Sequence, residues 1–140
     1  MAEAKRRVGI LGGTFDPIHI GHLMLAEAVR NEYDLEQVLF IPAAQPPHKL
    51  ERKISSAEDR FMMTVLATCS NPAFEVSDIE MRREGPSYSV DTVRALIRAS
   101  GGEDMQAHSV RAHKKSSAHR SSFLLIWGSA PLPGTSPAAC

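Results

Sequence analysis

Two histidines, His19 and His22, stand three residues apart, directly after a glycine-rich segment. An imidazole can donate a hydrogen bond to a non-bridging phosphate oxygen and so share the negative charge that develops during phosphoryl or nucleotidyl transfer. This chemistry needs charge stabilisation more than it needs a covalent nucleophile. A zinc site is the alternative for two histidines, but no Asp, Glu or Cys follows nearby at helical spacing as a third ligand. The pair therefore predicts a phosphate contact and no bound metal.

The residues before the histidines have the composition of a phosphate-binding turn. Gly12 and Gly13 would let the backbone approach a phosphate closely, and Gly13 and Thr14 can offer N–H groups to it. Gly21 and His22 are expected at the start of a helix, where free N–H groups and the dipole favour an anion. A side chain at position 21 would block the nucleotide. The alternatives are an ordinary tight turn at the paired glycines and a surface coincidence for the histidines.

The predicted secondary structure places this turn between a strand and a helix. Residues 8–11 are a short apolar run, residues 20–33 carry an apolar face at helical spacing, and residues 38–41 are a second apolar run. Apolar runs without alternation are typical of parallel strands that are covered on both faces. Strand, helix and strand in this order predict a right-handed βαβ unit.

Three further elements are predicted along the next segment of the chain. Residues 55–58, Ser-Ser-Ala-Glu, have the form of a capping box. They would open a helix with four apolar residues: Phe61, Met62, Val65 and Leu66. Residues 74–79 alternate as a half-exposed strand does, and residues 89–99 are expected to form a helix. The complete order predicts a doubly wound, mostly parallel α/β sheet, which binds ligands outside the carboxyl ends of its strands.

The charge distribution divides the chain near residue 104. The 140 residues balance 16 Lys and Arg against 16 Asp and Glu, which gives no general electrostatic argument for a nucleic-acid or anionic-membrane partner. All acidic residues lie in residues 1–104, which carry a formal charge of −4, whereas residues 105–140 carry +4. We expect a domain over 1–104 and an atypical, poorly packed tail over 105–140. A basic-tailed RNA-binding protein is the alternative.

Other features of the sequence bear on where the protein is found. No apolar run approaches the roughly 20 residues of a membrane span. The N-terminus has no apolar signal region. Two cysteines are too few for a disulfide framework. These features predict a cytoplasmic protein without a membrane partner.

The turn and the histidine pair together resemble the signature of the nucleotidyltransferase superfamily, Gly-Gly-x-Phe-Asp-Pro followed by His-x-Gly-His. Residues 12–22 read Gly-Gly-Thr-Phe-Asp-Pro-Ile-His-Ile-Gly-His. Within this superfamily, three further segments, 41–49, 59–63 and 87–92, are similar to bacterial nicotinate-nucleotide adenylyltransferases. The resemblance covers about residues 6–104 and implies a Rossmann-like fold of the nucleotidyltransferase type.

The resemblance implies an enzyme that transfers AMP from ATP to nicotinate mononucleotide and releases pyrophosphate, with Mg²⁺ bound to the triphosphate. Its implied catalytic residues are His19 and His22. The implied ATP- and phosphate-binding residues are Gly12, Gly13, Thr14, Phe15, Gly21 and Lys49. Thr92 would face the nicotinate end of the substrate. The alternatives are a solvated loop charge for Lys49 and ordinary helix N-terminal chemistry for Thr92.

The resemblance ends after Asp104. The family continues with an apolar strand that ends in Gly-Ala-Asp and with a late Ile-Ser-x-Thr-x-Ile-Arg motif that holds ATP. Here residues 123–130 resemble that strand loosely, Ser129-Ala130 replaces Ala-Asp, and the late motif is absent from the 140 residues. We expect an incomplete C-terminal part in which only residues 123–127 form a regular element. An adenylyltransferase and a catalytically incomplete nucleotide-binding fragment both remain open, and the sequence indicates no oligomeric state.

Overall fold

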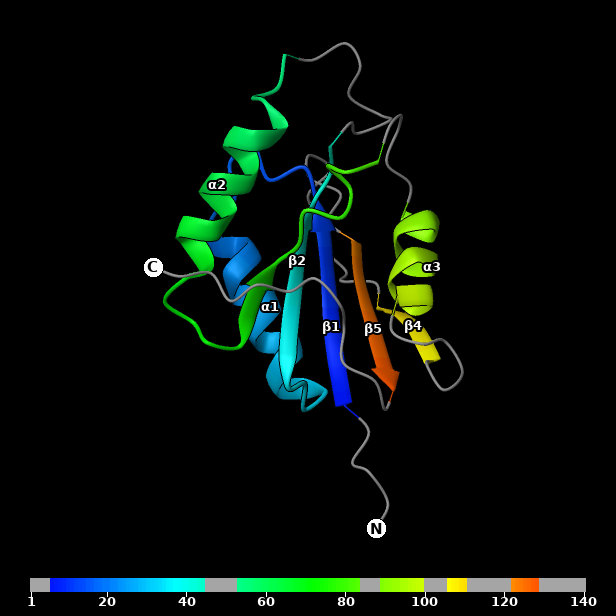
Figure 1. Ribbon diagram of the computed structural model, residues 1–140. Coiled ribbons are helices and arrows are strands. Elements are labelled where there is room, and N and C mark those ends of the chain that lie inside the picture. Colours follow the sequence, from blue (N-terminus) through cyan, green and yellow to red (C-terminus); the bar gives the residue numbers. More distant parts are fainter. Residues whose placement is uncertain (1–5, 45–52, 84–88, 100–105, 111–121, 129–140) are drawn as a thin grey trace.

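The computed structural model describes residues 6–44, 53–83, 89–99, 106–110 and 122–128. Their elements are β1 (Arg6–Gly13), α1 (Ile20–Glu32), β2 (Gln37–Pro42), α2 (Ala57–Thr68), β3 (Phe74–Val76), α3 (Ser89–Ala99), β4 (Gln106–Val110) and β5 (Ser122–Gly128). The strands among these residues form one sheet in the order β3-β2-β1-β5-β4 (Figure 1). β5 runs antiparallel to both of its neighbours, while β1, β2 and β3 are parallel to one another. The predicted α/β class, built on a parallel βαβ unit, is confirmed.

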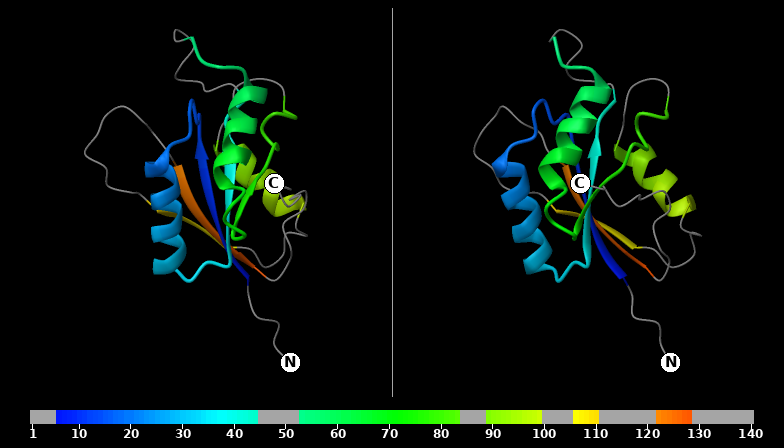
Figure 2. Two further views of the ribbon diagram at one scale, coloured as in Figure 1. Left: turned by 90° about the vertical axis from the view of Figure 1, so that its left-hand side faces the viewer. Right: turned by 60° about the vertical axis from the view of Figure 1, so that its left-hand side comes forward.

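Helices cover both faces of the sheet. α1 and α2 lie on one face and α3 lies on the other (Figure 1 and Figure 2). Along β2, Val38 and Phe40 belong to the core under α1 and α2, whereas Leu39 and Ile41 belong to the core under α3. Because both faces are covered, the strand needs apolar side chains at successive positions, which explains the unbroken apolar run in the sequence.

β3 is shorter than the predicted strand over residues 74–79. Phe74 and Val76 are buried and the residue between them is partly exposed, as the alternation predicts. The chain turns beyond them, where the Ser77 hydroxyl accepts a hydrogen bond from the backbone N–H of Ile79 at 3.3 Å. A serine side chain that captures a nearby backbone group competes with the strand ladder.

The start of α2 lies one residue later than the predicted capping box implies. Ser56 is the N-cap residue, and its hydroxyl accepts a hydrogen bond from the backbone N–H of Asp59 at 3.1 Å. Glu58 and Asp59 lie in the first turn, where negative charge is favourable for the helix dipole. The prediction of a capped helix is confirmed, with Ser56 in place of Ser55 as the cap.

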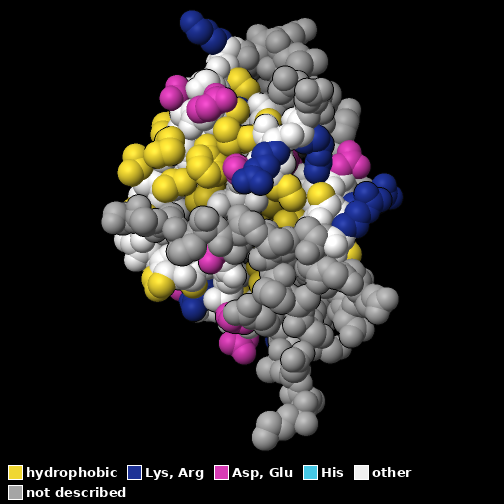
Figure 3. Space-filling view, viewed as in Figure 1, with side chains coloured by type: hydrophobic (Ala, Val, Ile, Leu, Met, Phe, Trp, Pro, Cys, Tyr) yellow, Lys and Arg dark blue, Asp and Glu magenta, His cyan; other side chains and the backbone are white. Residues whose placement is uncertain are grey.

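The most buried side chains of α2 are polar. Arg60, Thr64 and Thr68 stand four residues apart and are at most 1% exposed. The Thr64 hydroxyl donates to the Arg60 carbonyl and the Thr68 hydroxyl donates to the Thr64 carbonyl, both at 2.8 Å, so burial leaves neither hydroxyl unsatisfied. Met62 and Leu66, from the predicted apolar set, are 52% and 70% exposed. Hydrophobic side chains gather on the α2 side of the molecule in Figure 3.

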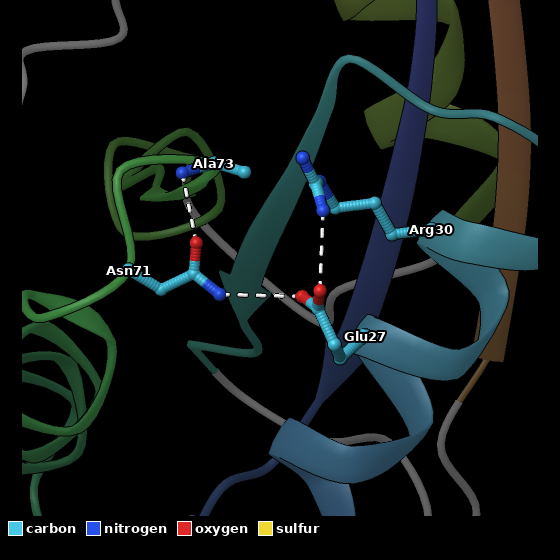
Figure 4. Close-up of polar contacts among 4 residues, drawn as sticks. All are labelled: Glu27, Arg30, Asn71 and Ala73. Atoms are coloured by element: carbon cyan, nitrogen blue, oxygen red, sulfur yellow. Dashed lines mark hydrogen bonds and ion pairs between the residues drawn. The ribbon is translucent and has the colours of Figure 1, made fainter.

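A polar cluster ties α1 to the loop before β3 (Figure 4). The Glu27 carboxylate accepts hydrogen bonds from Arg30 Nη1 at 3.1 Å and from Asn71 Nδ2 at 3.2 Å. Asn71 Oδ1 accepts from the backbone N–H of Ala73, whose carbonyl accepts from the N–H of Val38 in β2. The cluster therefore links the helix that carries the histidines to the edge of the parallel sheet.

Two strands lie in the part of the chain beyond residue 104. β5 contains the predicted apolar run 123–127 and pairs antiparallel with β1, and β4 pairs antiparallel with β5. The expectation that residues 123–127 are the only regular element of 105–140 is wrong. β4 forms because its backbone pairs with that of β5, and its own side-chain pattern does not reveal this pairing. The domain division at residue 104 stays a prediction, and residues 111–121 and 129–140 lie outside the described ranges.

Candidate functional site

The glycine-rich turn lies at the carboxyl ends of β1 and β2. Gly13 ends β1 and stands in register with Pro42, which ends β2. The backbone N–H of Ala43 donates to the Gly13 carbonyl at 2.8 Å, so the two loops leave the sheet side by side. Open α/β sheets bind ligands outside the carboxyl ends of parallel strands. Gly12, Gly13 and Thr14 thus lie at the edge of the sheet where the sequence predicts a ligand.

His19 and His22 begin α1 and share one space. His19 is the N-cap residue, and its Nδ1 accepts a hydrogen bond from the backbone N–H of Gly21 at 3.1 Å. His22 Nδ1 accepts from the backbone N–H of His19 at 3.2 Å. The two ring centroids are 3.9 Å apart. This is a capping box in which imidazoles replace the more usual Ser or Thr and Glu or Gln.

The cap determines which ring nitrogen of each histidine carries hydrogen. An Nδ1 that accepts a hydrogen bond has no hydrogen of its own, so the neutral ring carries its hydrogen on Nε2. Nε2–H is then the group that can donate to a phosphate oxygen. A ring that is protonated on both nitrogens could not accept from the backbone, and its part of the cap would break. In this arrangement, an imidazole that donates to a phosphate oxygen does so from Nε2.

The backbone at the start of α1 differs from the prediction. The Gly21 N–H donates to His19 Nδ1, and the His22 N–H donates to the His19 carbonyl at 3.0 Å. The prediction that these two N–H groups are free for an anion is wrong, because the side chain and carbonyl of His19 satisfy them. The dipole of α1 still favours negative charge at this end of the helix.

Phe15 anchors the turn in the core. Its side chain is 2% exposed, its backbone φ is 50°, and its ring lies edge-on to the ring of His22 with centroids 5.1 Å apart. A Cβ atom on Gly13 would lie 3.0 Å from the Phe15 ring, so a side chain at position 13 would force the buried ring to shift by a few tenths of an ångström. Packing against Phe15 is thus one reason for glycine at position 13. Its other predicted role, close approach of the backbone to a phosphate, stays a prediction. Phe15 can reach a ligand only through its backbone, because its side chain is buried.

Arg60 of α2 reaches the turn from the neighbouring helix, although sequence reasoning gave it no role. Its side chain is 1% exposed. The guanidinium donates to four backbone carbonyls. Nη1 donates to the carbonyls of Thr14, at 2.9 Å, and Ala43. Nη2 donates to the carbonyl of Ala44 at 3.0 Å, and Nε donates to that of Ser55 at 2.9 Å. These carbonyls belong to the turn after β1, the loop after β2 and the segment before α2. One side chain therefore joins three separate pieces of backbone.

Electrostatics and a further hydrogen bond support the same junction. Burial lowers the pKa of Arg60 from its ordinary value, and the Asp16 and Glu58 carboxylates act against this lowering. Asp16 Oδ2 accepts a hydrogen bond from the backbone N–H of Ser55 at 2.8 Å. The turn is thus linked twice to the beginning of α2. The available sequence signal was the polar series Arg60, Thr64 and Thr68, whose members stand four residues apart along α2.

Thr92, the predicted substrate residue, lies on α3, on the opposite face of the sheet from the histidine pair. It is 3% exposed, and its hydroxyl donates to Glu80 Oε1 at 2.6 Å and accepts from Arg83 Nη1 at 3.4 Å. Glu80 was not singled out from the sequence; it is 7% exposed, and its Oε2 has no hydrogen-bond partner in the described part of the chain. Lys49 lies outside the described residues, so its predicted role stays a prediction.

Side chains that could hold a metal do not gather in the described ranges. There, no group of three or more His, Cys, Asp and Glu side chains is placed to bind an ion. Within the same ranges, no helix is long and apolar enough to cross a membrane.

Two imidazole side chains thus lie beside the carboxyl ends of the parallel strands, where open α/β sheets bind their ligands. The chain belongs to the cytidylyltransferase-like family, whose sequence profile matches residues 10–126. That match continues past residue 104 and includes β4 and most of β5.

Curated relatives match about two thirds of the chain. A probable nicotinate-nucleotide adenylyltransferase of Thermoanaerobacter sp. (strain X514) is 54% identical over 99 residues, which are 71% of this chain and 47% of the relative. A protein with the same name from Moorella thermoacetica is 58% identical over 97 residues, 69% of this chain and 45% of the relative. Another, from Acidothermus cellulolyticus, is 52% identical over 96 residues, 69% of this chain and 46% of the relative. The matched part thus spans less than half the length of these relatives.

Proposed function

We propose that this protein is a nicotinate-nucleotide adenylyltransferase, which transfers AMP from ATP to nicotinate mononucleotide and gives deamido-NAD and pyrophosphate. The observation that supports the chemistry best is the histidine pair, whose Nδ1 atoms accept from the backbone and whose Nε2–H groups can donate. The names of the curated relatives support the choice of substrate. A cytoplasmic location stays a prediction.

The proposed reaction is an in-line displacement at the α-phosphorus of ATP. A phosphate oxygen of nicotinate mononucleotide forms a bond to that phosphorus, while the bond to the bridging oxygen of the leaving pyrophosphate breaks. The leaving group takes the electron pair with it. His19 and His22 donate hydrogen bonds to phosphate oxygens as negative charge develops on them, so the step needs no covalent intermediate with the protein.

The remaining predicted residues have supporting roles in this proposal. Gly12, Gly13, Thr14 and Phe15 supply backbone beside the phosphates, Gly21 leaves room for the nucleotide, Lys49 adds positive charge, and Thr92 faces the nicotinate end. Mg²⁺ would neutralise charge on the triphosphate. We propose that it arrives with ATP and is held mainly by phosphate oxygens.

A nucleotide-binding chain without catalysis is the second candidate. The observation that favours it is the absence of the late Ile-Ser-x-Thr-x-Ile-Arg motif, which holds ATP in the family that the chain resembles, from the 140 residues. Such a chain would keep the phosphate-binding turn and would leave the triphosphate incompletely held.

One experiment separates the two candidates. The purified chain is mixed with ATP, Mg²⁺ and nicotinate mononucleotide, pyrophosphate release is followed, and ATP affinity is measured by calorimetry. Turnover supports the adenylyltransferase, and ATP binding without turnover supports the second candidate. Absence of both binding and turnover contradicts both. A parallel reaction with nicotinamide mononucleotide tests the choice of pyridine.

A further inference from the structure

We infer that Arg60 is a positioning residue for the phosphate site: it holds two peptide groups so that the N–H groups of Phe15 and Ala44 point toward the ligand. This inference rests on the proposed function, because the ligand in question is the triphosphate of ATP. Arg60 is not proposed to touch the ligand, since its Nε, Nη1 and Nη2 atoms donate to backbone carbonyls.

The geometry of the peptide group carries the first step. In a trans peptide the carbonyl of one residue and the N–H of the next point in opposite directions. The Thr14 carbonyl accepts from Arg60, so the N–H of Phe15 points away from the guanidinium. The Ala43 carbonyl also accepts from Arg60, so the N–H of Ala44 likewise points away. Arg60 thus sets the direction of one N–H in each of the two loops that leave β1 and β2.

The two N–H groups are suited to an anion. Among the described residues, neither the Phe15 N–H nor the Ala44 N–H has a hydrogen-bond acceptor. Their loops are held side by side by the hydrogen bond from the Ala43 N–H to the Gly13 carbonyl. Backbone N–H groups at the carboxyl end of a parallel sheet can bind phosphate, and an extended triphosphate has oxygens enough to contact N–H groups in two neighbouring loops.

Arginine is the side chain whose shape allows it to bond to carbonyls of several backbone segments at once. Its planar guanidinium carries five donors in a fixed fork, and here four hydrogen bonds reach carbonyls of three backbone segments. A lysine ammonium keeps the charge but donates from a single atom, so it cannot span the same carbonyls. The Arg60→Lys variant keeps the positive charge but loses the planar set of donors, so it shows which of the two affects ligand affinity.

A matched control is available on the same face of α2. Thr68 is 1% exposed, like Arg60, but its hydroxyl bonds to carbonyls of its own helix, those of Thr64 and Val65. Thr68→Val removes a buried hydrogen bond without touching the turn. It therefore reports what a loss of α2 stability alone does to ligand affinity.

The test measures the affinity of the full chain for MgATP and for inorganic tripolyphosphate. The wild type is compared with the Arg60→Lys, Arg60→Met and Thr68→Val variants at a temperature at which each of them is folded. We expect both Arg60 variants to weaken both ligands at least about tenfold, and Thr68→Val to leave affinity within about twofold even where its melting temperature falls. Equal weakening by Thr68→Val, or unchanged affinity in the Arg60 variants, overturns the inference.

A measurement on the wild-type chain keeps the inference testable if the Arg60 variants do not fold. In ¹⁵N-labelled protein, the amide signals of Phe15 and Ala44 should shift on addition of tripolyphosphate. Binding that leaves both signals in place overturns the inference and leaves the proposed function standing. A wild-type chain that binds neither MgATP nor tripolyphosphate overturns the proposed function, and this inference with it.

Discussion

His19 caps α1 with the same ring that we propose for phosphate contact. Its Nδ1 holds the Gly21 N–H, and its own N–H is held by His22. An alanine variant would lose the cap and the ring together, so its loss of activity could arise from either cause. Asparagine is among the best N-cap residues and has no imidazole, so it separates the two roles.

We expect His19→Asn to lower adenylyltransferase turnover by roughly 10² to 10³-fold, the usual effect of removing one donor to developing charge, with little change in the Michaelis constant. Its thermal unfolding should stay close to that of the wild type, whereas His19→Ala should lose both turnover and some stability. Steady-state kinetics and thermal unfolding of both variants provide the check. A His19→Asn protein with normal turnover would show that the ring serves only as a cap.

Thr92 offers a second prediction for a single residue. Thr92→Val removes the hydroxyl that donates to the buried Glu80 carboxylate at 2.6 Å. We expect the free energy of unfolding to fall by about 1–3 kcal/mol, because Glu80 then lacks its donor. Thr92→Ser keeps the hydroxyl and should lose less. Urea unfolding of both variants compares them, and equal losses would mean that the methyl packing of Thr92 matters more than its hydrogen bond.

At the scale of an element, the start of α2 rests on one of two adjacent serines. The Ser56 hydroxyl accepts from the Asp59 N–H, whereas Ser55 bonds to Asp16 and Arg60 through its backbone N–H and carbonyl. We expect Ser56→Ala to lower the free energy of unfolding by about 1 kcal/mol, the usual effect of losing an N-cap. Ser55→Ala keeps every backbone bond and serves as the control. If the two variants unfold at the same urea concentration, Ser56 is not the effective cap.

The elements also show what the sequence could predict. The βαβ unit and the helix over residues 89–99 were predicted because their signals are local: apolar runs, helical spacing and flanking breakers. The turn and the histidine pair are local too, within residues 12–22. Arg60 was missed because its partners, at positions 14, 43, 44 and 55, are brought together only by the topology of the sheet. β4 was missed because backbone pairing to β5 holds it in the sheet, while its own side-chain pattern gives no strand signal.

At the scale of the whole molecule, the position of β1 depends on the segment beyond residue 104. β1 lies between β2 and β5 in the described sheet, so it is an internal strand only while β5 is present. Without β5, its backbone groups would form an open edge, and the apolar surface beside it would be uncovered.

We therefore expect a chain of residues 1–104 to be less stable and more prone to associate than the full chain. Thermal unfolding and size-exclusion chromatography of the two proteins measure this, with a chain of residues 1–128 as the control that retains β5. A monomeric 1–104 chain that unfolds at the temperature of the full chain would support the division predicted at residue 104. It would also show that pairing with β5 adds little.

The polar inner face of α2 has a consequence for the uniqueness of the fold. A helix that packs through apolar contacts alone could turn about its axis and bury Met62 and Leu66, which are 52% and 70% exposed. Such a turn would withdraw Arg60 from its carbonyls and leave a guanidinium and several backbone groups buried without partners. Buried polar contacts of this kind select one arrangement among several of similar hydrophobic energy. We infer that hydrogen bonding by Arg60 fixes the orientation of α2 about its own axis, although burial of Met62 and Leu66 would favour a different orientation.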